Sequence, residues 1–139
     1  MDQRLRNFYR EAQVKNAPPG QVLVMLYDTL IEYAERADAE IATPSNPSDP
    51  LPASRAVSTC INIMTELSTS LRPSVNPELC GTLRDLYIFF TREFSEAFAK
   101  REPKRIRAIL PLIRGLRNAW SEAYHRAGQA QVLAAGAAA

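Results

Sequence analysis

The stretch Pro18-Pro19-Gly20-Gln21-Val22-Leu23-Val24-Met25-Leu26-Tyr27-Asp28 joins a helix-start signal to six consecutive apolar residues. Proline is tolerated in the first turn of a helix, because its missing N–H would have no partner there and its fixed φ suits the helix. Six apolar residues are far fewer than the roughly 20 that cross a bilayer. The stretch therefore predicts the start of a helix whose apolar stripe is wider than one core face needs.

Prolines divide the rest of the chain into blocks in which apolar residues recur at steps of three and four, the period of a helix. Ser54 and Asn76 can each cap a helix N-terminus, and Pro77 fits a first helical turn. The predicted helices cover Pro19 to Ala42, Ser54 to Leu71, Pro77 to Phe98 and Pro103 to His125. No segment alternates apolar and polar residues as a strand would. Because the later connections are short, we predict an all-α fold, an antiparallel up-and-down four-helix bundle with a short N-terminal arm or helix.

Length and composition fit one domain. A chain of 139 residues with 46% hydrophobic content can bury a core of its own, and we expect a single helical domain over residues 1–126. Its N-terminal arm, residues 1–17, is either a small amphipathic helix or a disordered leader. Residues 43–53 hold four prolines and are predicted to form a loop. Residues 127–139 are rich in alanine and glycine, have no apolar stripe and are predicted to be a disordered tail.

The chain shows no sign of export or membrane insertion. Its first residues lack the apolar core of a secretory signal, and no segment is long and apolar enough to span a bilayer. We therefore expect a cytoplasmic protein. Cys60 and Cys80 form no CxxC motif and have no histidine nearby in the sequence, so two buried, reduced thiols are expected.

Groups that could carry catalysis are scarce in this sequence. His125 is the only histidine, and Gly20 belongs to no phosphate-binding motif. The carboxylates lack the Glu and Glu-x-x-His arrangement that builds di-metal sites in helical bundles. We therefore expect no enzyme activity, no catalytic residues, no metal and no cofactor.

Apolar residues outside the four core stripes are the most unusual feature of the predicted helices. At about 100° per residue, Val24 and Ile31 form a second row on the first helix, while Ile63 widens the stripe of the second helix. Ile88 and Phe89 widen the stripe of the third helix. Two explanations remain open: tight packing against the arm and loops, or a groove for an amphipathic segment of another protein.

Basic residues cluster late in the chain. The net charge is only +2, but seven lysines and arginines lie between residues 100 and 117. This cluster supports an alternative function, a small helical adaptor or nucleic-acid-binding bundle that uses the basic surface of residues 100–117. No aromatic residues are interleaved with the cluster, so a solvated helix face is the favoured interpretation.

Four motifs, in order along the chain, resemble those of the flagellar secretion chaperone family FliS. They are the Pro19-to-Asp28 stretch, Glu66-Leu67 with Ser70-Leu71, Leu83-Arg84-Asp85-Leu86-Tyr87, and Leu116-Arg117-Asn118-Ala119-Trp120. Tyr9 matches a tyrosine in the N-terminal arm of the family. The resemblance covers about residues 8 to 124.

The resemblance implies a cytoplasmic export chaperone without a nucleotide or metal. Its partners would be the disordered C-terminal segment of flagellin, which it keeps from polymerising prematurely, and a component of the flagellar type III export apparatus. No nucleic acid is expected as a partner, and the arm around Tyr9 is expected to act as a movable cover. The predicted partner-binding residues are Tyr9, Val24, Tyr27, Ile31, Ile63, Ile88 and Phe89.

Overall fold

The computed structural model describes residues 19–71, 74 and 76–138. Four helices account for most of them: α2 (Pro19–Ala42), α3 (Leu51–Thr69), α4 (Pro77–Lys100) and α5 (Lys104–Ala138). No strand occurs among the described residues. The predicted all-α fold is confirmed.

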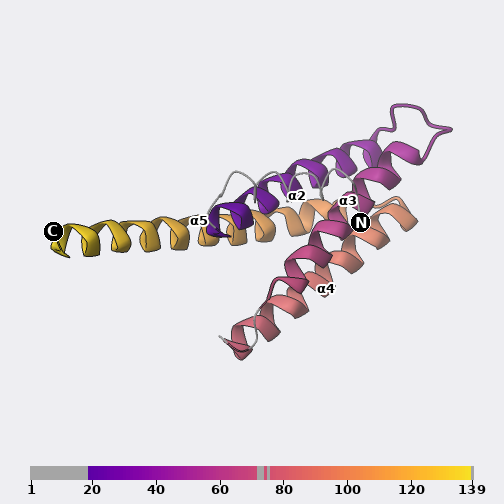
Figure 1. Ribbon diagram of the computed structural model, residues 1–139. Coiled ribbons are helices and arrows are strands. Elements are labelled where there is room, and N and C mark those ends of the chain that lie inside the picture. The colour runs from indigo at the N-terminus through magenta and orange to yellow at the C-terminus, as the bar shows by residue number, and fades with distance from the viewer. Residues whose placement is uncertain (1–18, 72–73, 75, 139) are drawn as a thin grey trace.

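The four helices pack in a closed ring of neighbours. α2 contacts α3 and α5, and α4 contacts the same two helices from the other side. Figure 1 shows that α2 runs antiparallel to α5, that α3 runs antiparallel to α4, and that the two pairs cross. The predicted four-helix bundle is therefore confirmed, with α2 and α4 lying diagonally across it.

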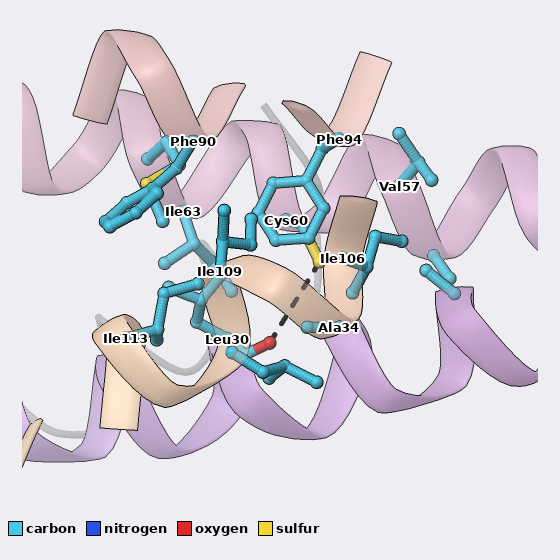
Figure 2. Packing of buried hydrophobic residues seen from close by; sticks show 14 of the residues in the cluster. Leu30, Ala34, Val57, Cys60, Ile63, Phe90, Phe94, Ile106, Ile109 and Ile113 are labelled. Atoms are coloured by element: carbon cyan, nitrogen blue, oxygen red, sulfur yellow. Dashed lines mark hydrogen bonds between the residues drawn. The ribbon is translucent and has the colours of Figure 1, made fainter. Parts of the chain in front are cut away.

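The core is built from one apolar stripe of each helix. Figure 2 shows Leu30 and Ala34 of α2 facing Cys60 of α3, Phe94 of α4 and Ile106 of α5. The Cys60 thiol lies 4.0 Å from the carbonyl oxygen of Leu30 in an apolar setting, and burial raises its pKa. Cys60 and Cys80 are both free and buried, as predicted.

Two helix starts show where local sequence signals succeed and fail. Asn76 caps α4, because its Oδ1 accepts a hydrogen bond of 3.1 Å from the N–H of Leu79. The predicted start of α3 is wrong: the helix begins at Leu51, after Pro50, with no side-chain cap. Pro52 lies in its first turn, where a proline loses no hydrogen bond, so the loop is shorter than the predicted residues 43–53.

The end of α5 also differs from the prediction. The helix continues to Ala138 instead of ending near His125, so the predicted disordered tail is helical. Alanine, which dominates this segment, has the highest helix propensity of all residues. In Figure 1 this yellow end of α5 projects far beyond the other three helices.

A tight turn joins α4 to α5. Arg101 has a left-handed backbone conformation (φ 53°), and its N–H bonds to carbonyl groups in the last turn of α4. The N–H of Glu102 bonds to the carbonyl of Ala97 at 2.9 Å. This helix-ending geometry reverses the chain within a few residues and sets α5 against α4.

Candidate docking surface

Ion pairs line the interface between α2 and α5. Asp28 and Asp38 of α2 lie 2.8 and 2.9 Å from Arg117 and Arg107 of α5. Glu35, between them on α2, pairs with Arg114. The partners follow one another in opposite order along the two helices, which fixes an antiparallel register.

The second apolar row of the first predicted helix belongs to this interface. Val24, Asp28, Ile31 and Glu35 follow one another at steps of four, three and four residues, so they share one side of α2. Two of them pair with arginines of α5, so this side faces α5. Val24 and Ile31 are accordingly half-buried, and Ile31 packs against the core.

Ion pairs within the bundle neutralise much of the basic cluster at residues 100–117. Arg105 pairs with Glu93 at 3.1 Å and with Glu102 at 2.6 Å, and Lys100 pairs with Glu96 at 2.8 Å. Hydrogen bonds to Glu93 and Glu102 raise the pKa of Arg105, and the hydrogen bond that Arg105 donates lowers the pKa of Glu102. The charge that motivated a nucleic-acid-binding alternative is thus largely matched within the bundle, which weakens that hypothesis.

The ion pair between Glu93 and Arg105 identifies the sides on which α4 and α5 face each other. Residues seven apart in a helix are separated by two turns and lie on the same side. Leu86 and Leu79 precede Glu93 by seven and fourteen residues, and Leu112 follows Arg105 by seven. These leucines therefore lie on the facing sides of the two helices.

An apolar surface results on these facing sides, and we call it the α4–α5 apolar surface. It consists of Leu79, Leu86 and Phe89 on α4 with Leu112 and Leu116 on α5. Leu79, Phe89 and Leu112 keep 45%, 43% and 52% of their area exposed, whereas Leu86 and Leu116 pack partly against the core. Figure 1 shows the start of α4 diverging from α5, so α5 does not cover this part of α4.

The residues predicted to bind a partner lie in different parts of the structure. Tyr27 and Ile63 have no exposed area and belong to the core. Phe89 lies on the α4–α5 apolar surface, whereas Ile88, 100° further round α4, points away from it. Tyr9 lies outside the described residues.

Sequence reasoning did not select Leu79, Leu86, Leu112 and Leu116 as docking residues. Leu79, Leu86 and Leu116 fit the core stripes by spacing, and Leu112 lies outside the stripe. Their exposure depends on how far α4 and α5 diverge, for which a single sequence gives no signal.

A hollow lies between α2 and α3. It has a volume of about 740 Å³, and its lining includes Tyr33, Arg36 and Glu40 of α2 and Arg55 and Asn62 of α3. Arg36 lies over the ring of Tyr33 at 4.8 Å. Among the described residues, no group of three or more histidines, cysteines or carboxylates could hold a metal ion.

A family model described as "Flagellar protein FliS" matches residues 1–127 of the chain. The match includes α2, α3 and α4 and most of α5. The chain belongs to the FliS family. This confirms the resemblance seen in the four sequence motifs.

FliS family membership implies a flagellar export chaperone role, and the family is not known as enzymatic. Residues 128–138, the projecting end of α5, lie beyond the family match. No curated protein matches the chain. Within the described part of the chain, no helix is long and apolar enough to cross a membrane.

Proposed function

We propose that this FliS family member binds the disordered C-terminal segment of flagellin in the cytoplasm. Binding would prevent premature polymerisation and allow delivery to the flagellar type III export apparatus. The observation that carries this proposal is the family match over residues 1–127, which includes nearly the whole bundle.

The α4–α5 apolar surface supports the proposal as a docking site. A disordered client can fold on binding and lay the apolar face of a helix into a groove between two helices. Phe89 on α4 and Leu112 on α5 offer exposed apolar area for such a contact. Exposed apolar side chains gathered in this way mark interaction sites on monomeric proteins.

Isothermal titration calorimetry with a flagellin C-terminal segment tests the proposal. We expect a one-to-one complex with the full chain and no heat from an N-terminal flagellin segment of equal length. Absence of binding at protein concentrations of tens of micromolar would overturn the proposal.

Two substitutions test the surface itself. Phe89→Asp and Leu112→Asp should each weaken binding at least about tenfold, or about 1.4 kcal/mol. The matched control is Ile88→Asp, which adds the same charge to α4 on another side and should leave the affinity within about twofold. Equal losses for Phe89→Asp and Ile88→Asp would show that the client binds elsewhere.

A further inference from the structure

An exposed isoleucine lies between two arginines on the outer side of α4. Arg84, Ile88 and Arg92 are four residues apart, so they form one stripe along the helix, which we call the α4 basic stripe. Both arginines are exposed, and Ile88 keeps 52% of its area in contact with solvent. Its centre points away from the α4–α5 apolar surface, because Ile88 and Phe89 lie 100° apart around the helix, whereas Arg92, three residues after Phe89, lies at the edge of that surface.

The arginines of this stripe differ from those of α5. Arg105, Arg107 and Arg114 all pair with carboxylates. In contrast, no carboxylate of the described residues lies within 4.0 Å of the guanidinium nitrogens of Arg84 or Arg92.

Neighbouring carboxylates on α4 do not cancel this charge. Glu96, one turn beyond Arg92, is bound to Lys100 at 2.8 Å, and the charge of Arg92 is the smallest of the causes that act on the pKa of Glu96, which Lys100 chiefly lowers. Asp85 follows Arg84 in the sequence but forms no ion pair with a described residue. The stripe thus presents two positive charges against one negative charge, around an apolar side chain.

We propose that the α4 basic stripe docks an acidic amphipathic helix of a partner protein. An apolar residue of that helix would cover Ile88, and its carboxylates would pair with Arg84 and Arg92, since guanidinium groups bind carboxylates through two parallel hydrogen bonds. The arginines are eight residues apart, about 12 Å along α4. The partner carboxylates should therefore be seven or eight residues apart.

The exposed isoleucine favours a peptide over a nucleic acid. A phosphate backbone would satisfy both arginines but leave the centre of the stripe uncovered, whereas an amphipathic helix buries it. The centre of the stripe at Ile88 points away from the surface proposed for flagellin, so the partner would be a component other than the flagellin segment.

Fluorescence anisotropy of the full chain with a designed peptide tests this proposal. The labelled probe is a helix-forming peptide of alanine and glutamine, with two glutamates eight residues apart and a leucine midway between them. At low salt we expect saturable binding that weakens at least about tenfold in the double variant Arg84→Glu/Arg92→Glu and in Ile88→Asp. The matched control, Arg55→Glu/Lys104→Glu, changes the net charge equally on other helices and should stay within about twofold.

Three outcomes would overturn the proposal. The first is no binding to the unmodified chain, and the second is an equal loss in the control variant, which would indicate non-specific attraction. The third is equal or tighter binding of a lysine version of the peptide or of single-stranded DNA. Circular dichroism checks that each variant is folded, and calorimetry should show that Ile88→Asp still binds the flagellin segment. The two proposals can therefore fail separately.

Discussion

The phenolic oxygens of Tyr27 on α2 and Tyr87 on α4 lie 2.6 Å apart in the core and share a hydrogen bond. The two residues keep only 0% and 2% of their area exposed, and they belong to diagonally opposed helices. Among the described residues, no buried side-chain nitrogen or oxygen lacks a hydrogen-bond partner. The pair therefore supplies a directional contact across a core built mainly of apolar side chains.

Tyr27→Phe should destabilise the bundle by about 1–3 kcal/mol, because the hydroxyl of Tyr87 would be left buried without its partner. The double variant Tyr27→Phe/Tyr87→Phe should lower the free energy of unfolding by less than the sum of the two single variants, since it removes both polar groups. Urea unfolding followed by circular dichroism measures the free energies. Strict additivity would show that the two hydroxyls are not coupled.

Stability should fall above about pH 10. Burial raises the pKa of Tyr27 and of Tyr87 above the ordinary tyrosine value near 10. The folded state therefore keeps protons that the unfolded chain releases. The stability that the two protonated tyrosines contribute is complete below about pH 10. It is lost as the pH rises towards the folded-state pKa values, by up to about 1.4 kcal/mol per pH unit for each tyrosine.

Urea midpoints measured between pH 8 and pH 11 test this dependence. The Tyr27→Phe/Tyr87→Phe variant is the control and should show a shallower decline. Some decline should remain in that variant, because burial also raises the pKa of the Cys60 thiol. An identical decline with and without the two tyrosines would contradict the prediction.

Gly20→Ala should destabilise the start of α2. A Cβ atom at position 20 would lie 2.5 Å from Cδ2 and 3.3 Å from Cβ of Tyr124 on α5, so the base of that side chain would have to move as well. We expect the free energy of unfolding, measured in urea, to fall by about 1–3 kcal/mol. Replacing glycine with alanine within a helix usually raises it. Gly20→Ala/Tyr124→Ala should relieve the clash.

Gly115→Ala provides the matched comparison for Gly20→Ala. A Cβ atom at Gly115 would meet nothing within 4 Å, and the residue is exposed within α5. The substitution should therefore stabilise the protein by about 0.5–1 kcal/mol. If both alanines changed stability in the same direction, close packing against Tyr124 would not explain the glycine at position 20.

The fold was largely predictable because local signals agree with one another. Prolines other than Pro111, which lies inside α5, mark the helix boundaries. Apolar steps of three and four mark the core, and the Asn76 cap works as its sequence suggests. The start of α3 was misplaced because a proline in a first turn is compatible with a helix as well as with a loop. The end of α5 was misplaced because the alanine-rich segment has helix propensity but no apolar periodicity.

The candidate docking surface was less predictable, for a geometric reason. Periodicity places a residue on one side of its helix but does not say which neighbouring helix covers that side. Val24 and Ile31 lie outside the core stripe of their helix, yet α5 packs beside them. Conversely, Leu79 fits a core stripe and is exposed because α4 diverges from α5.

Ile31→Asp tests this reassignment of the second apolar row. Ile31 packs against the core on the side of α2 that faces α5, so a carboxylate there would lose apolar burial and stand on the same side as Asp28 and Glu35. We expect a destabilisation of about 2–3 kcal/mol in urea unfolding. Ile88→Asp, on the exposed side of α4, should change stability by less than about 0.5 kcal/mol. A fully stable Ile31→Asp protein that has lost flagellin binding would instead return Ile31 to the docking surface and contradict its role in packing α2 against α5.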